Sequence, residues 1–290
     1  MTFLSGIARR LKAIARAADV RPYVPPVKAV KPVKLPEPVN ETPEPLPVAE
    51  TRKENEVSFN PKLFFAYLRA NGLRHRTAEQ VAGTEAILDA CAGLPISWVA
   101  YACATAWHET GGNMKPNVES LNYSVSGLLN TFGRHRISRS DAERLGRKPG
   151  EPALSLARQR AIANILYGGE WGRANLGNTM PDDGWTYRGR GMAHDTGRRN
   201  YRLSGEAVGI DLLTDPDALL DTATAARVMV TGMKTGRYTS HAFHTHLPQG
   251  EATAAQFGQA RRIINGTDKA AQIAGHALLF QNALKAAGWQ

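Results

Sequence analysis

A proline-rich stretch divides the 290-residue chain into a part that can fold and a part that cannot. Nine of the 17 prolines fall between Pro22 and Pro47, where they alternate with Val, Lys and Glu. Proline lacks a backbone N–H and fixes φ, so residues 21–56 should form a semi-rigid, extended linker. We therefore expect one folded domain at residues 57–290.

Residues 1–20, ahead of this linker, predict a short basic amphipathic helix. Leu4, Ile7, Leu11 and Ile14 share one helical face, and the basic residues lie largely elsewhere. Four basic residues interrupt the apolar run, so the pattern differs from a secretory signal. Three interpretations stay open, namely an unpacked tail, docking to a partner, and contact with an anionic membrane.

Charge and composition exclude several classes of protein. The net charge of +10 favours contact with acidic polymers such as nucleic acids, anionic lipids or bacterial wall polymers. No nucleic-acid recognition motif is present, so we expect no specific nucleic-acid partner. The longest apolar stretch, at residues 96–107, is too short to span a bilayer. Cys91 and Cys103 lie in apolar segments and are expected to be buried free thiols.

Hydrophobic periodicity predicts a mainly helical body. Five segments have the apolar spacing of helices, at residues 60–73, 77–94, 95–109, 215–236 and 270–287. Thr77 and Gln80 have the spacing of a capping box. Pro95 begins the third segment and two glycines end it. Val, Ile and Tyr never alternate long enough to build a large sheet.

Glu109 is the first candidate for chemistry. It falls in the last turn of a predicted helix, where the negative end of the helix dipole disfavours a charged carboxylate. Partial burial against Trp107 would act in the same direction, as a general acid requires. The alternative is a solvated helix end. A zinc protease motif starting at His108 would need a second histidine at Gly112, so we expect no metal there.

Glu119 is a second carboxylate, beyond the turn that the two glycines permit. A pair of carboxylates across a cleft is the minimum requirement for glycoside hydrolysis, since one protonates the leaving oxygen and the other activates water. The spacing in sequence does not give the distance between Glu109 and Glu119. An ordinary loop acid therefore stays open as the alternative.

The segment from Asp182 to Tyr201 combines closely spaced glycines with aromatic and polar side chains. The glycines allow tight backbone approach, and Trp185 and Tyr187 can offer a flat apolar face to a sugar ring. Hydrogen-bonding groups come from Thr196, Asn200 and Tyr201. A dinucleotide-binding GxGxxG loop is a poor alternative because His194 stands where the third glycine is required.

Two polar segments nearer the C-terminus leave alternatives open. Three histidines, His241, His244 and His246, have no acid or cysteine beside them, so a surface turn is favoured over a metal site. Asn265 stands at a helix break, where it either contacts a substrate or caps the helix that follows.

Six of these segments occur in one order along the chain. They are WHETGG (107–112), ESLNYS (119–124), ILYGGEWG (165–172), DGWTYRGRG (183–191), TGRRNY (196–201) and RRIINGTDKA (261–270). Together they resemble glycoside hydrolase family 19, and in particular the chitinase-like lysins of bacteriophages. The resemblance runs from about Phe64 to Ala287 and implies a mainly α, lysozyme-like two-lobed fold, with 57–290 as the catalytic domain.

The resemblance implies inverting hydrolysis of a β-1,4-linked N-acetylhexosamine polymer, with no metal or cofactor. Glu109 matches the general acid position, and Glu119 matches the second carboxylate of the phage members. Thr196, Asn200 and Asn265 match positions associated with the nucleophilic water or the sugar. The full set of expected substrate-binding residues is His108, Tyr123, Ser124, Trp185, Tyr187, His194, Thr196, Asn200 and Asn265.

One departure from the family pattern follows the glycines of GRG. The family usually has a hydrophobic pair and then Gln, Leu and Thr, whereas this chain places His194 and Asp195 before Thr196. His194 thus replaces a glutamine that commonly contacts substrate, and Asp195 replaces an apolar residue. We expect an altered sugar register or reduced activity, and a pH dependence from the titration of His194.

The prediction is a monomeric phage-type endolysin that cuts peptidoglycan glycan strands, moving from the host bacterial cytoplasm to the cell wall. Residues 1–20 would contact an anionic membrane or a virion. Two alternatives stay open. One is a chitinase acting on N-acetylglucosamine polymers, and the other is a catalytically weakened, virion-associated wall-binding protein.

Overall fold

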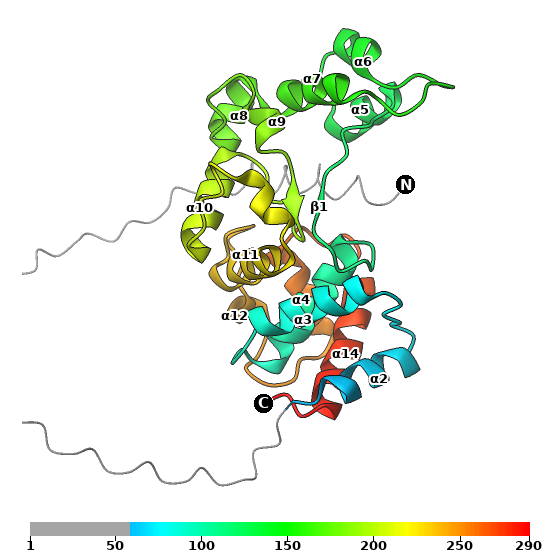
Figure 1. Ribbon diagram of the computed structural model, residues 1–290, viewed down its shortest axis with the longest axis vertical. Helices are drawn as coiled ribbons and strands as arrows, with labels where there is room; N and C mark the ends of the chain where they lie inside the picture. The colour runs from blue at the N-terminus through cyan, green and yellow to red at the C-terminus, as the bar shows by residue number, and fades with distance from the viewer. Residues whose placement is uncertain (1–58) are drawn as a thin grey trace, which may run out of the picture.

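The computed structural model describes residues 59–290, so the predicted N-terminal helix, the whole predicted linker and the first two residues of the predicted domain lie outside the described residues. The described chain is mainly helical and forms two lobes, with a two-stranded ribbon beside the connection between them (Figure 1). This architecture confirms the predicted fold class. Among residues 59–290, no helix has both the length and the apolar character needed to cross a membrane.

The larger lobe is built around α4 (Ile96–Glu109). Every side chain from Ser97 to Ala106 is buried, as expected of a helix that is apolar on all sides. The helices that share its core are α2 (Pro61–Ala70), α3 (Ala78–Ala90), α11 (Thr222–Thr235), α12 (Phe243–His246), α13 (Ala254–Ala260) and α14 (Ala270–Ala286). Helix α14 packs along α4 and places its first turns beside the end that holds Glu109.

Local signals position the helix ends of this lobe. The capping box predicted at Thr77 is present, because the Thr77 side chain accepts from the Gln80 N–H and the Gln80 side chain accepts from the Thr77 N–H.

The single helix predicted over 215–236 is wrong. It is split into a 3-10 turn, η1 (Pro216–Leu220), and α11, because Asp221 leaves helical geometry and caps α11 through the Thr224 N–H at 2.8 Å.

The two cysteines are buried free thiols, as predicted. Cys91 and Cys103 both lie in the core of the larger lobe. Burial raises the pKa of both thiols. We therefore expect neither to act as a nucleophile or to be oxidised easily at neutral pH.

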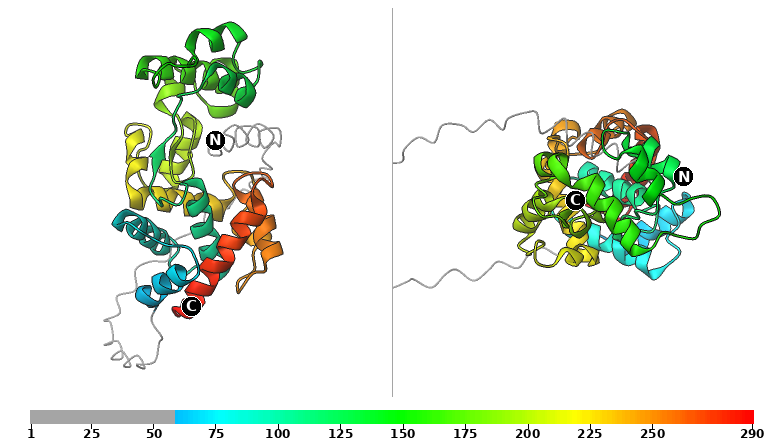
Figure 2. Two further views of the ribbon diagram at one scale, coloured as in Figure 1. Left: turned by 90° about the vertical axis from the view of Figure 1, so that its right-hand side faces the viewer. Right: turned by 90° about the horizontal axis from the view of Figure 1, so that it is seen from above.

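The smaller lobe is formed by short helices that the periodicity did not reveal. They are α5 (Val125–Phe132), α6 (Arg139–Leu145), α7 (Leu156–Tyr167), α8 (Gly169–Leu176) and α9 (Asp183–Thr186). These helices enclose a second apolar core and lie at one end of the molecule in both side views (Figures 1 and 2). Serine caps at 124, 138 and 155 start three of them, each by accepting a backbone N–H three residues on.

A two-stranded ribbon joins the segment that precedes the smaller lobe to the segment that follows it. Strand β1 (Asn117–Val118) pairs antiparallel with β2 (Arg190–Gly191), and no larger sheet occurs in residues 59–290. A third, small apolar cluster packs next to the ribbon between α10 (Arg198–Val208), η1 and α11. Because Glu119 directly follows β1, the ribbon places it beside the backbone of Gly189.

Candidate active site

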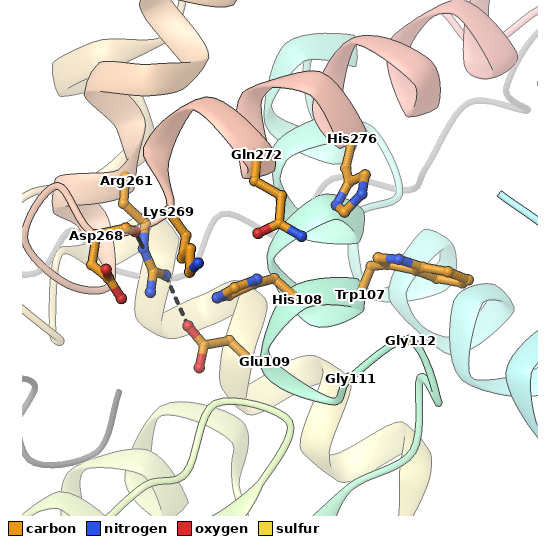
Figure 3. Close-up of a pocket in the computed structure, with 10 residues that line it drawn as sticks. All are labelled: Trp107, His108, Glu109, Gly111, Gly112, Arg261, Asp268, Lys269, Gln272 and His276. Atoms are coloured by element: carbon orange, nitrogen blue, oxygen red, sulfur yellow. Dashed lines mark hydrogen bonds and ion pairs between the residues drawn. The ribbon is translucent and has the colours of Figure 1, made fainter. Parts of the chain in front are cut away.

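A pocket of about 380 Å³ lies between the C-terminal end of α4 and the N-terminal end of α14 (Figure 3). Its lining residues are Trp107, His108, Glu109, Gly111, Gly112, Arg261, Asp268, Lys269, Gln272 and His276. In Figure 3, Gln272 and His276 extend from α14 toward the α4 side of the pocket. Glu109 and His108 therefore face a polar wall from a segment more than 150 residues away in sequence.

Glu109 is held by a buried arginine. Nη1 of Arg261 lies 2.8 Å from Oε1 of Glu109, with side-chain exposures of 1% and 13% respectively. Nε of Arg261 donates to the Asp268 carbonyl at 3.1 Å, which fixes the guanidinium from its other side. A guanidinium at this distance stabilises the ionised carboxylate, in opposition to the helix-end effect expected from the sequence. The carboxylate thus has a fixed position and a charge partner.

The imidazoles of the pocket are biased toward their neutral forms. Burial lowers the pKa of His108, and burial together with the charge of His108 lowers the pKa of His276. Neutral imidazoles both donate and accept hydrogen bonds. With Gln272 they provide uncharged polar groups of the kind that bind hydroxyl and acetamido groups.

Glu119 occupies a different environment, outside the lining of this pocket. It is 5% exposed, and its two oxygens accept from the Gly189 N–H at 2.7 Å and the Tyr167 hydroxyl at 2.8 Å. Burial raises the pKa of Glu119, although both hydrogen bonds act in the opposite direction. A carboxylate with raised proton affinity is a stronger base toward water.

Three predicted site residues converge around Gly189. A methyl group added there would lie 3.4 Å from Cδ of Glu119, 3.3 Å from Oγ1 of Thr196 and 3.2 Å from Nδ1 of His194. Thr196 donates to the His194 carbonyl at 3.0 Å, and Asn200 donates to the Thr196 carbonyl at 2.7 Å. The structure therefore groups Glu119, His194, Thr196 and Asn200, and places Glu109 and His108 in the pocket.

Gly189→Ala should lower turnover on a glycan substrate by about tenfold or more, because sub-ångström displacement of reacting groups is costly. The added methyl group lies closer to His194 and Thr196 than most real contacts do, so one of these two side chains must shift beside Glu119. The matched control is Gly258→Ala, whose new methyl group meets nothing within 4 Å. Equal turnover for both variants and the wild type would show that this packing does not position catalytic groups.

Glu119→Gln should lower activity and change how folding stability depends on pH. Glutamine has one acceptor oxygen for the two donors of Gly189 and Tyr167, so the size of the Tm change at a single pH is less informative than its pH dependence. A carboxyl group whose pKa is raised on folding contributes most to stability below its unfolded pKa, and that contribution is lost as pH rises through the folded pKa. The Tm of the variant relative to wild type should therefore rise from pH 4 to pH 7, by about 2–4 °C per kcal/mol. Thermal unfolding of both proteins at both pH values tests this, and a Tm difference that stays constant or falls between pH 4 and pH 7 would contradict it.

Several predicted binding residues have structural roles. The prediction that Tyr187 offers a face to a sugar is wrong, because the side chain is 4% exposed and its hydroxyl donates to the Leu213 carbonyl at 3.2 Å. Tyr123 is 3% exposed in the core of the smaller lobe, and Ser124 caps α5. Trp185 is partly buried, and the guanidinium of Arg188 lies 3.7 Å from its ring centroid. One face of Trp185 is thereby covered.

The alternative role for Asn265, a helix cap, is wrong. Lys269 holds the N-cap position of α14, whereas Oδ1 of Asn265 accepts from the N–H of Gly266 at 2.9 Å. The backbone N–H of Asn265 donates to the Arg261 carbonyl, so the residue belongs to the turn that carries the partner of Glu109. Its contact with substrate stays a prediction.

The histidine segment is more ordered than the surface turn expected there. His246 ends α12, and its Nε2 lies 3.0 Å from Nδ1 of His241, with the rings stacked. His244 is exposed. Across residues 59–290 no group of three or more His, Cys, Asp or Glu side chains is arranged to hold a metal ion.

The departure at His194 and Asp195 is accommodated by the fold. Asp195 is 5% exposed, accepts from Oγ of Ser204 at 3.0 Å and lies 3.5 Å from Arg237. A buried carboxylate in place of an apolar residue is thus paired. His194 has φ 52°, an uncommon backbone conformation for a non-glycine residue that occurs preferentially at functional sites.

The sequence did not reveal five residues that surround the two candidate carboxylates, Glu109 and Glu119. They are Tyr167 at Glu119 and Arg261, Lys269, Gln272 and His276 around Glu109. The spacing of Gln272 and His276 puts them on one face of a predicted helix, and that signal was available. Which of the two consecutive arginines at 261 and 262 points inward depends on tertiary packing, so no local pattern identifies Arg261.

Comparison with known proteins gives partial matches. The chain is 35% identical over 109 residues to a glycosyl hydrolase family 19 domain-containing protein of Haemophilus influenzae, covering 38% of this chain and 48% of the relative. It is 29% identical over 109 residues to chitinase 11 of Oryza sativa subsp. japonica, covering 34% and 42% respectively. The similarity supports glycoside hydrolase family 19. No protein-family model matches, and the chain spans about half the length of these curated relatives.

Proposed function

We propose that this protein is a phage-type endolysin that hydrolyses β-1,4 glycosidic bonds of bacterial peptidoglycan by an inverting, two-carboxylate mechanism. The main support is the arrangement of Glu109, at the edge of a 380 Å³ polar pocket and paired with a buried arginine. The family 19 name of one relative supports glycoside hydrolysis. Peptidoglycan as the substrate draws support from the resemblance to phage lysins and from the net charge of +10, which favours anionic wall polymers.

In this proposal Glu109 is the general acid. It donates its proton to the bridging oxygen of the scissile bond, and the sugar ring gains positive character as the bond breaks. The carboxylate that remains lies 2.8 Å from Arg261, which stabilises the charge that forms as the proton leaves. The same ion pair favours ionised Glu109 in the free protein, so the proposal requires Glu109 to take up a proton before it can act. His108 and the α14 residues Gln272 and His276 would hold the sugar so that the bridging oxygen faces Glu109.

Glu119 is the general base. It removes a proton from the water that attacks the opposite face of the ring, and its raised pKa makes it a stronger base. Thr196, which shares the surroundings of Gly189 with Glu119, would orient that water. The negative charge of Glu119 also stabilises the positive ring in the transition state.

Chitin is the competing substrate. The name of the rice relative is chitinase 11, and the neutral polar groups beside Glu109 suit a chain of N-acetylglucosamine units. The two glycans share this unit, so the pocket alone accommodates either. The substrate must be assigned from the products.

Digestion of purified peptidoglycan and of chitin oligomers tests the proposal. After borohydride reduction, mass spectrometry identifies the sugar at each new reducing end. Reduced N-acetylmuramic acid ends indicate a muramidase, and reduced N-acetylglucosamine ends from peptidoglycan indicate a glucosaminidase. Cleavage of chitin alone would make the protein a chitinase. No product from either polymer would overturn hydrolysis and favour a wall-binding protein.

A further inference from the structure

Two arginines of the smaller lobe are stacked on tryptophans. The guanidinium carbon of Arg136 lies 3.1 Å from the ring centroid of Trp171, and that of Arg188 lies 3.7 Å from Trp185. Arg136 comes from the turn between α5 and α6, whereas Trp171 belongs to α8 (Figure 1). Stacking holds each planar guanidinium in one orientation before any ligand arrives.

Neither arginine is in direct contact with a carboxylate in the described part of the chain, although Arg188 lies within the electrostatic influence of Glu119 and Asp217. Among residues 59–290, no ion pair includes Arg136 or Arg188. The buried Nη2 of Arg136 has no hydrogen-bond partner in the same part of the chain, while Arg188 donates only to the Trp185 carbonyl at 2.7 Å. Burial lowers the pKa of Arg136 to about 10 and also lowers that of Arg188. A partly desolvated cation of this kind is stabilised when an anion binds.

The charges of both arginines act on Glu119 or on its hydrogen-bond donor Tyr167. The charge of Arg188 partly offsets the burial that raises the pKa of Glu119. Burial likewise raises the pKa of Tyr167, the charge of Arg136 opposes that effect, and the Tyr167 hydroxyl donates to Glu119. An anion held by Arg136 or Arg188 would thus lie close to the proposed general base.

We propose that Arg136 and Arg188 bind carboxylates of the glycan substrate, which are those of the stem peptides or, on muramic acid units that have lost their stem peptide, the lactyl carboxylate. The inference rests on the proposed function and adds a physical basis for preferring peptidoglycan over chitin. A guanidinium fork matches the two oxygens of a carboxylate, and chitin has no such group. The uncharged polar groups beside Glu109, which are His108, Gln272 and His276, would then contact features common to both polymers, and the two arginines would distinguish the anionic one.

Binding to modified cell-wall sacculi tests this inference without relying on turnover. The probe is the full-length Glu109→Gln protein, and co-sedimentation measures its dissociation constant for native sacculi and for sacculi whose carboxylates are amidated with methylamine. We expect at least about tenfold tighter binding to the native form. Adding Arg136→Met or Arg188→Met should remove most of that preference. Adding Arg134→Met, which removes an exposed arginine two positions away, should retain it.

Sacculi stripped of stem peptides by an amidase show which carboxylate is bound, since only the lactyl group remains. Arg136→Lys keeps the charge without the planar fork and should keep only part of the preference. Equal binding to native and amidated sacculi, or a preference that survives both methionine substitutions in folded protein, would overturn the inference. Failure of hydrolysis is a separate result, seen when the wild type releases no reducing ends.

Discussion

Glu109→Gln should lower glycan cleavage by about 10²–10⁴-fold, the usual contribution of a general acid. Glutamine keeps an oxygen that can accept from Arg261, so the pocket should retain its shape while losing the proton that the bridging oxygen needs. The release of reducing ends from peptidoglycan measures the effect, with circular dichroism to confirm an intact fold.

The matched control for this variant is Glu251→Gln. Glu251 is also a glutamate in an ion pair, with Lys285 at 2.7 Å, but both side chains are more than half exposed. The Glu251→Gln variant should cleave glycan at the wild-type rate. If Glu109→Gln retained most of its activity, Glu109 would not be the acid, and the pocket would lose its assigned role.

Arg261→Gln should cost about 3–5 kcal/mol of folding stability as well as activity, the range seen when one partner of a buried ion pair is removed. The arginine is 1% exposed and ties Glu109 to the Asp268 carbonyl, so its loss disrupts two segments together. Urea unfolding measures the stability, and initial rates measure the activity.

A double-mutant cycle separates the ion pair from general packing. Arg261→Gln in the Glu109→Gln background should cost measurably less stability than in the wild type, with a coupling above about 0.5 kcal/mol. Strictly additive losses would indicate that Arg261 stabilises the fold without engaging Glu109.

The helical core was predictable because its signals are local. Helix α4 is an apolar run with Pro95 before it and glycines after it, and the α3 capping box depends on residues three positions apart. The helices of the smaller lobe escaped prediction since they are short and polar, and start at serine caps that also occur in loops. Such segments are stabilised by tertiary packing more than by their own periodicity.

The two candidate carboxylates of the site were suggested by the sequence, but much of their environment was not. Motif resemblance identified Glu109 and Glu119, but the charge partner of one and the burial of the other arise from distant segments. The error at Tyr187 has the same origin. An aromatic residue near glycines can face a ligand or fill a core, and only the packed neighbours Tyr201 and Leu213 decide between them.

The anomeric configuration of the first product tests the central claim most directly. Proton NMR should follow the wild-type protein on a soluble β-1,4-linked N-acetylhexosamine oligomer or peptidoglycan strand, before mutarotation equilibrates the new reducing end. Attack of water on the face opposite the leaving group predicts the α-anomer first. Initial formation of the β-anomer would indicate a retained configuration and contradict a mechanism in which Glu109 and Glu119 act on opposite faces of the ring.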